Sequence, residues 1–387
     1  MNKNKITTER IYYLDSMRAI LMMLGVVLHS AQVFSPEQSW KIYSEYTTPI
    51  AEWMVYIIHV FRMPAFFIIS GYFAIFTLHK YNIEKFLKVR ILRIIIPLVI
   101  TAITLNSLQA YVLTKTGWID FELISYIKEG QWVSHLWFLI NLIVYFLIFS
   151  IGYRFFHPVY KKIMQLTNMI YTKSNIFVML SFMTLFAIAL VIMISFISKF
   201  INVNGIINLN SILYYISFFI FGVLLYSNKE MQREFIEISP IITLPIIVVS
   251  LYSYTYFSQF EGKLYKLIYV FFDITAKYYI SALCFYLFYK FTNRSSKIFY
   301  FLSNASYTVY LFHQVFVIVI GLLLIKFNIG GFLGLMILMI SVSLLSVSVH
   351  YYFISRVDFL SFLFNGKRLN TPLSKKNDPE TKEGNRE

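Results

Sequence analysis

The chain has 387 residues, of which 58% are hydrophobic and only 14% are charged. A typical soluble domain carries about 25% charged residues, so this composition excludes an ordinary soluble domain and predicts an all-α integral membrane protein. Its one cysteine, Cys284, excludes an intrachain disulfide and a cysteine metal site, and we expect no bound metal or cofactor.

Runs of about 20 mostly apolar residues, the length that a membrane-spanning helix needs, recur along the chain. They predict about ten transmembrane helices, near residues 11–34, 53–78, 91–113, 135–156, 176–198, 208–227, 238–257, 264–289, 298–325 and 329–354. We therefore interpret residues 1–10 as a cytoplasmic segment, 11–355 as one transmembrane domain and 366–387 as a polar, disordered cytoplasmic tail.

The net charge of +15 is distributed unevenly between the two sides of these predicted helices. With the N-terminus placed in the cytoplasm, inner segments hold 24 of the 34 Lys and Arg residues, outer loops hold 7, and 3 lie inside spans. Short cytoplasmic loops retain Lys and Arg, so this bias predicts that both termini are cytoplasmic. Nucleic-acid binding is then not needed to explain the charge.

The two longest outer loops, near residues 35–52 and 114–134, contain several aromatic residues, including Trp40 and Trp118. Tryptophan and tyrosine are common at membrane interfaces, which favours a role as anchors. The alternative is a platform for a sugar ring.

The first predicted helix carries polar residues on one face. Asp15, Arg18, Met22, Gly25 and His29 follow one another at steps of three and four residues. An ionisable side chain inside a membrane costs about 2.5 to 3.5 kcal/mol at mid-bilayer, so such residues tend to face a cavity. At a rise of 1.5 Å per residue, we expect His29 toward the outer leaflet and Arg18 nearer the cytoplasm.

The second helix repeats this pattern with His59, Arg62, Phe66 and Ser70, and we expect His59 and Arg62 at the depth of His29. Other polar residues of the predicted spans are His135, Asn141, Asp273, Lys277, Tyr310 and His313. We expect these side chains to converge on one polar cavity open to the outside.

A histidine can accept a hydroxyl proton at neutral pH, and an arginine can hold an oxyanion or a phosphate. Each residue also has a structural alternative. His59 and His313 can serve as hydrogen-bonding partners across helices, and Asp273 with Lys277 can form a neutralising pair. The shared face of His29 and Arg18 favours a function for those two.

A basic cluster of Lys88, Arg90 and Arg93 opens the third span on its cytoplasmic side. Composition alone favours a topology signal. The alternative is a binding site for the phosphates of an anionic donor such as coenzyme A, because the guanidinium fork suits phosphate.

Several segments together resemble the membrane-bound acyltransferase-3 family. They are residues 13–19 followed by His29, and residues 61–73, 90–93, 134–139 and 306–313, in the order of the family. The resemblance implies ten transmembrane helices and transfer of an acyl group from cytoplasmic acyl-coenzyme A to a carbohydrate on the far side. It also implies that His29 is the catalytic histidine, Arg18 its supporting arginine, and Arg90 with Arg93 the donor-binding pair.

Within the family, the resemblance is greatest to bacterial inner-membrane members that place succinyl groups on osmoregulated periplasmic glucans. The expected partners are therefore acyl-coenzyme A, a periplasmic glucan, the lipid bilayer and other glucan-synthesis membrane proteins. Our hypothesis is that His29, with His59 nearby, activates a glucan hydroxyl while Arg62 or Arg18 stabilises the oxyanion. A covalent acyl relay through the protein is an alternative route.

Two rival functions remain open from the sequence. One is transfer of acetyl to a sugar of lipopolysaccharide or exopolysaccharide. The other is a proton-coupled transporter or flippase that uses Asp273, Lys277 and the histidines as a proton path, although paired halves with interrupted helices are not evident.

Overall fold

The computed structural model describes residues 11–199 and 206–367, and these residues form helices and connecting loops without a β-strand. Ten helical segments are long and apolar enough to cross a membrane. In chain order they are α1 (Tyr12–Val33); α2 (Pro49–Lys80); α3 (Ile83–Thr101), η1 (Ala102–Asn106) and α4 (Ser107–Lys115); α5 (Leu123–Lys128), η2 (Gln131–Leu136) and α6 (Trp137–Phe155); α8 (Ile176–Ile197); α9 (Leu209–Ser227); α11 (Pro240–Phe257); α12 (Lys263–Thr292); α13 (Lys297–Lys326); and α14 (Gly331–Val349) with η3 (His350–Ile354). Shorter helices are α7 (His157–Tyr171), α10 (Lys229–Ile236) and α15 (Asp358–Asn365).

The all-helical class and the ten spans predicted from sequence are confirmed. The third and fourth segments are longer than predicted, because α3 continues through η1 into α4, and α5 with η2 precedes α6. The predicted N-terminal segment to residue 10 and most of the predicted tail lie outside the described residues.

Local sequence explains where many helices begin. An asparagine caps α3, α8, α9 and α10, with the side-chain oxygen accepting a backbone N–H of the first turn. Proline occupies the first turn of α2 and α11, where its missing N–H costs nothing.

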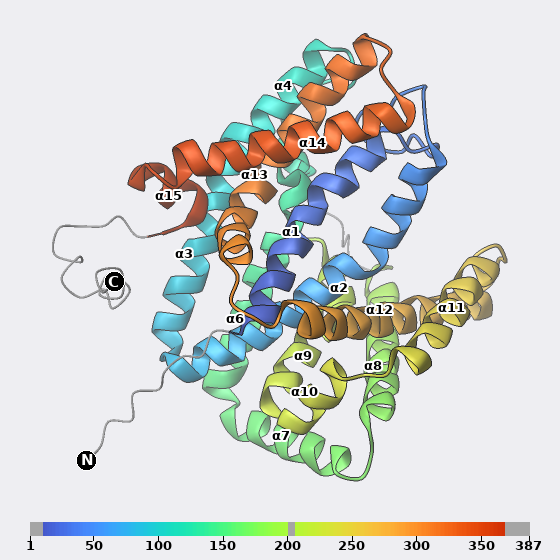
Figure 1. Ribbon diagram of the computed structural model, residues 1–387. Coiled ribbons are helices and arrows are strands. Elements are labelled where there is room, and N and C mark those ends of the chain that lie inside the picture. The colour runs from blue at the N-terminus through green and yellow to red at the C-terminus, as the bar shows by residue number, and fades with distance from the viewer. Residues whose placement is uncertain (1–10, 200–205, 368–387) are drawn as a thin grey trace.

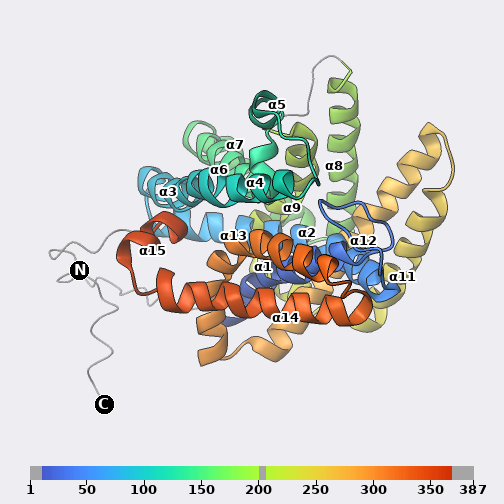
Figure 2. The ribbon, with the colours of Figure 1, turned by 90° about the horizontal axis from the view of Figure 1, so that it is seen from above.

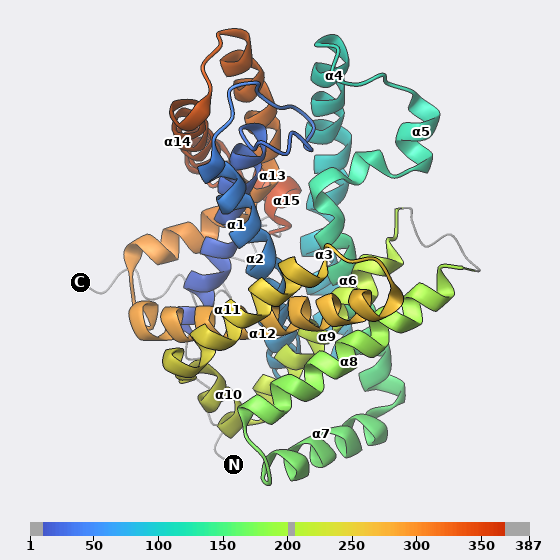
Figure 3. The same ribbon diagram turned by 90° about the vertical axis from the view of Figure 1, so that its right-hand side faces the viewer.

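Helix α7 was not predicted, because it is too short and too polar to cross a membrane. Its apolar residues Val159, Ile163 and Leu166 share one face and are about half exposed. The helix lies at one end of the molecule (Figure 3). An exposed apolar face of this kind is typical of a helix that lies in the membrane interface.

We call the side where α1 begins and α2 ends the N-terminal side, and the side where residues 34–48 join α1 to α2 the far side. Helices α1 and α13 pack along each other, and α13 also packs on α14 and α4 (Figures 1 and 2). Helix α15 packs on α3. Segments far apart in sequence thus meet around α1, α2, α3 and α13, which contribute residues to the pockets described below.

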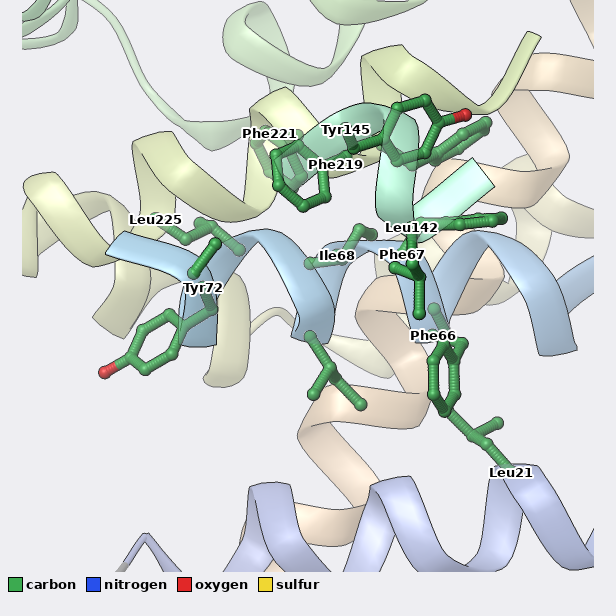
Figure 4. Close-up of a cluster of buried hydrophobic side chains, with 14 of the residues drawn as sticks. Leu21, Phe66, Phe67, Ile68, Tyr72, Leu142, Tyr145, Phe219, Phe221 and Leu225 are labelled. Atoms are coloured by element: carbon green, nitrogen blue, oxygen red, sulfur yellow. The ribbon is translucent and has the colours of Figure 1, made fainter. Parts of the chain in front are cut away.

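The core is centred on α2, which passes between α1 and α9 (Figure 4). Phe66 extends from α2 toward Leu21 of α1, and both side chains are buried. On the opposite face the α2 and α9 backbones approach closely at Gly71 and Gly222. A Cβ at Gly222 would overlap the Ile68 carbonyl oxygen, and one at Gly71 would overlap that of Phe219. Small residues at this contact let the two helices bury their aromatic neighbours.

We therefore expect Gly222→Ala to lower the free energy of unfolding by about 1 to 3 kcal/mol, because the added methyl group overpacks backbone against backbone. The measurement is equilibrium unfolding of the purified protein in mixed micelles. Gly152→Ala is the matched control, since nothing lies within 4 Å of a Cβ built there. An equal response of the two variants would contradict this account of the α2 and α9 contact.

Candidate active site

A cavity of about 690 Å³, which we call the far-side cavity, lies between α1, α2, the 34–48 loop, η2, α9, α12 and α13. Its polar lining includes residues from six of these segments, namely His29, Gln32, Trp40, Lys41, His59, Arg62, Ser134, His135, Asp273, Lys277 and Gln314. These residues are distant in sequence, so the cavity is a product of the tertiary fold.

His29 is held in one orientation within this cavity. Its Nδ1 lies 2.7 Å from the side-chain oxygen of Gln32, one turn further along α1. With that oxygen as acceptor, Nδ1 carries the proton and Nε2 is the basic nitrogen. The ring stacks on Trp40 and on His313, at centroid distances of 5.4 and 5.3 Å. The basic Nε2 of His29 is therefore oriented by a hydrogen bond from Nδ1 to an amide oxygen rather than to a carboxylate.

Gly25, one turn below His29 on the same face of α1, leaves space for two functional groups. A Cβ there would lie 3.1 Å from Arg62 Nη1 and 3.2 Å from His313 Nε2. His313 is fully buried, and its Nδ1 donates to the Tyr310 carbonyl oxygen at 2.6 Å. Arg62 Nη1 and His313 Nε2 are buried without a hydrogen-bond partner among the described residues. A buried guanidinium in this condition is well suited to an oxygen anion supplied by a ligand.

His135 lies in η2, two residues before α6 begins, and lines the same cavity. Its ring packs edge-on against those of His313 and Tyr310. Tyr310 donates a hydrogen bond of 2.5 Å to the His135 carbonyl oxygen. These contacts join α13 to the η2 segment.

The side chains of Asp273 and Lys277 on α12 and of Tyr214 on α9 each contact the other two. Lys277 Nζ lies 2.5 Å from Asp273 Oδ2, and the Tyr214 hydroxyl donates to the same carboxylate at 2.6 Å. Lys277 Nζ also donates to the Tyr214 hydroxyl at 2.7 Å. This geometry favours the neutralising-pair interpretation. Asn141 lies outside the far-side cavity and exchanges hydrogen bonds with Ser211, linking α6 to α9.

A second pocket, of about 220 Å³, lies on the N-terminal side, and we call it the basic pocket. Arg18, Arg90 and Arg93 line it. Arg18 Nη2 donates to Ser303 at 3.2 Å and lies 3.5 Å from Asp15. Arg90 Nη2 donates to the Phe73 carbonyl oxygen at 3.0 Å and to Thr77. Three guanidinium groups at one pocket suit a polyanionic ligand.

The two pockets approach each other at an apolar constriction. A cavity of about 10 Å³ lies there, lined by Met22, Phe66 and Phe138 together with Arg62 and Met63. Met22, Phe66 and Phe138 also line the basic pocket, and Arg62 and Met63 also line the far-side cavity. Arg62 therefore stands where the two pockets meet.

Comparison with known proteins agrees with this architecture. The family model described as an acyltransferase domain, that of acyltransferase family 3, matches residues 11–348. The chain belongs to the acyltransferase-3 family. It is accordingly a multi-pass membrane acyltransferase.

Curated relatives of this acyltransferase include glucans biosynthesis protein C of Salmonella gallinarum (strain 287/91 / NCTC 13346) and that of Salmonella paratyphi B (strain ATCC BAA-1250 / SPB7). Each is 29% identical over 387 residues, covering 94% of this chain and 97% of the relative. No solved structure matches the chain.

The residues predicted for one cavity lie in different pockets of the acyltransferase. His29, His59, Arg62, His135, Asp273 and Lys277 line the far-side cavity, and His313 packs behind His29. Arg18 and Ser70 line the basic pocket, Tyr310 lies at the constriction, and Asp15 lines a small pocket near Arg294. Lys88 is exposed and lies outside the basic pocket, whereas Arg90 and Arg93 line it.

Sequence reasoning missed several lining residues of the acyltransferase. Trp40 turns inward onto His29, so the anchor interpretation does not describe it, and Lys41 beside it enters the cavity. Asn365 follows the last span and lines the basic pocket, where Thr308 holds its side chain. The sequence shows a tryptophan and a lysine in an outer loop. It does not show that they point into the cavity, because that direction depends on tertiary contacts.

Burial lowers the pKa of Lys41 to about 8. About half of this amine is then unprotonated at pH 8, whereas an ordinary lysine with a pKa near 10.4 is almost wholly protonated. We expect the initial rate of Lys41 modification by a water-soluble acylating reagent to level off above pH 8 to 9. Peptide mass spectrometry of short pulses across pH 6.5 to 10.5 measures this rate, with an added lysine peptide as the standard. A Lys41 profile that parallels the free peptide throughout would contradict the burial effect.

Proposed function

We propose that this acyltransferase resides in the bacterial inner membrane and moves a succinyl group from cytoplasmic succinyl-coenzyme A to a hydroxyl of a periplasmic glucan. The observation that carries the proposal is the arrangement at the constriction. An oriented histidine and an arginine whose Nη1 has no hydrogen-bond partner among the described residues line the far-side cavity, and a pocket with three arginines lies on the other side of the constriction.

The excess of Lys and Arg in alternate loops supports placing the N-terminal side in the cytoplasm. The basic pocket then faces the compartment that supplies acyl-coenzyme A, and the far-side cavity faces the periplasm. The relatives named glucans biosynthesis protein C support a glucan as the acceptor.

The donor would bind with its phosphates against Arg18, Arg90 and Arg93. Arg90 is oriented for this role by its bonds to the backbone of Phe73 and to Thr77. Arg18 and His29 share one face of α1 and are 11 residues apart, or about 16 Å along the helix. An extended pantetheine arm is of comparable length, so its thioester can reach the constriction while the nucleotide stays in the basic pocket.

The acceptor would bind in the far-side cavity. Trp40, Trp137 and Tyr215 line it and offer flat aromatic surfaces to sugar rings, while its polar groups can bind hydroxyls. The cavity of about 690 Å³ is large enough for a terminal sugar unit of a longer glucan.

The chemistry then follows from the positions of His29 and Arg62. His29 Nε2 accepts the proton of the glucan hydroxyl as its oxygen attacks the thioester carbonyl carbon. Of the two arginines considered from sequence, Arg62 lines the same cavity as His29, and this supports assigning oxyanion stabilisation to Arg62. The carbon–sulfur bond breaks, the coenzyme A thiolate takes the proton from His29, and the glucan ester remains.

The rival functions differ in their structural support. Acetyl transfer to another surface polysaccharide would use the same histidine and arginines, so the donor and acceptor must be separated by experiment. A proton path through Asp273 and Lys277 has less support, because these groups are hydrogen-bonded to each other and to Tyr214.

We expect His29→Ala to reduce transfer by about 100-fold or more, because a positioned general base contributes about 10² to 10⁴-fold. Mass spectrometry of periplasmic glucans measures their succinyl content in a strain that lacks the gene and carries wild-type or variant protein. His79→Ala, at an exposed histidine at the end of α2, is the matched control and should restore succinylation.

Normal succinylation by a His29→Ala protein present at wild-type level in the membrane would contradict the catalytic role. Glucans that are unchanged by loss of the gene would contradict the proposed acceptor. Surface polysaccharides would then be compared for a lost acetyl group.

A further inference from the structure

Lys41 occupies an unusual position for a lysine of an outer loop. It enters the far-side cavity, and its Nζ donates to Ser134 Oγ at 2.8 Å. Among the described residues Lys41 forms no ion pair with a carboxylate. One bond leaves two of its three N–H groups available to a ligand in the cavity.

The partner of Lys41 is itself fixed. Ser134 has φ 46° and ψ −122°, a backbone conformation that L residues rarely adopt. Its hydroxyl donates to the side-chain oxygen of Gln314 at 3.1 Å, so its lone pairs are directed to Lys41. Strained residues of this kind persist where surrounding contacts hold them, and they cluster at ligand sites.

Both ends of this Lys41, Ser134 and Gln314 chain adjoin the ring of His29. Trp40 immediately precedes Lys41 and stacks on the His29 ring. His313 immediately precedes Gln314 and stacks on the same ring. Arg62 lies about one turn deeper, beside Gly25. The cavity thus places one cation at the constriction and a second on the outer side of the histidine.

We propose that Lys41, held by Ser134, binds the free carboxylate of a dicarboxylic acyl group and thereby selects succinyl-type donors over uncharged ones. This inference rests on the proposed function and names the residue that selects its donor. A thioester that enters through the constriction is led by the far end of its acyl chain, and its carbonyl comes to lie at Arg62 and His29. The acyl chain beyond the carbonyl extends outward, and a four-carbon dicarboxylic group directs its one free carboxylate toward Lys41.

Two features support a carboxylate as the ligand. A charge-assisted hydrogen bond to a carboxylate is stronger than a bond between neutral groups, and the Ser134 hydroxyl holds the ammonium in place before binding. An uncharged acetyl or butyryl group would leave the Lys41 ammonium without a counter-ion. An anionic group on the acceptor glycan is the other possible source of the same chemistry, and the experiment separates the two.

The test uses the full-length protein in lipid nanodiscs with either a neutral or an anionically substituted glucan acceptor and either succinyl- or butyryl-coenzyme A. We expect Lys41→Met to lower kcat/KM for the succinyl donor by about 10- to 100-fold, the effect of losing a hydrogen bond to a charged group. For the butyryl donor we expect a change of less than about threefold. Lys41→Arg should retain most of the preference, and Lys115→Met is the control at an exposed lysine on the same side of the membrane.

Equal losses with both donors would overturn the inference, because they would assign Lys41 to the acceptor or to folding. Unchanged discrimination in Lys41→Met would overturn it as well. A dependence on Lys41 that appears with both donors only when the glucan carries anionic substituents would place the anion on the acceptor and so overturn the assignment to the donor. Absence of acyl transfer by wild-type protein from either donor is a different result, which would contradict the proposed function and this inference with it.

Discussion

Ionised side chains are costly in the hydrocarbon region of a membrane, and this constraint determines which helix faces turn inward. In this protein α1 and α2 carry four of the ionisable residues to which this constraint applies, Arg18, His29, His59 and Arg62. Each lines an internal cavity. The apolar faces of the same two helices pack against α9 and α13 in the core. The packing that buries the core therefore also turns the polar groups toward the pockets.

The close approach of α1 to its neighbours at Gly25 connects this packing to the chemistry. A larger residue would occupy the space of the Arg62 guanidinium and the His313 ring. Because Arg62 has no hydrogen-bonded counter-ion among the described residues, the site retains a cation for a ligand oxygen. Hydrogen bonding by Gln32 orients His29 without introducing a carboxylate that would neutralise this cation.

Periodicity was sufficient to predict the spans and the shared face of Asp15, Arg18 and His29, because both depend on residues close together in sequence. It also placed His59 and Arg62 with His29, and the structure brings all three to one cavity. The division into two pockets was not predictable, because the constriction is formed by Met22, Phe66 and Phe138 from three different helices. Periodicity placed Met22 and Phe66 on the polar faces of the first two helices, but it did not bring Phe138 to them.

The inward direction of the 34–48 loop likewise could not be predicted from the sequence. It is set by backbone bonds from Ser44 to Val33 and from Thr48 to Phe34, and by the bond of Lys41 to Ser134, 93 residues away. Helix α15 is a similar case. It is too short to appear as a span, yet Gly366, in a left-handed conformation, lets the chain pass against Arg93 and brings Asn365 to the basic pocket.

The central claim is that two pockets on opposite sides of the membrane meet at the Arg62 constriction. Transfer by sealed proteoliposomes of known orientation tests it most directly, with membrane-impermeant acyl-coenzyme A and glucan supplied on the same or on opposite sides. The account predicts transfer when the donor is on the side of Arg90 and Arg93 and the acceptor on the side of the 34–48 loop. Transfer at an equal rate with both substrates on one side would contradict it.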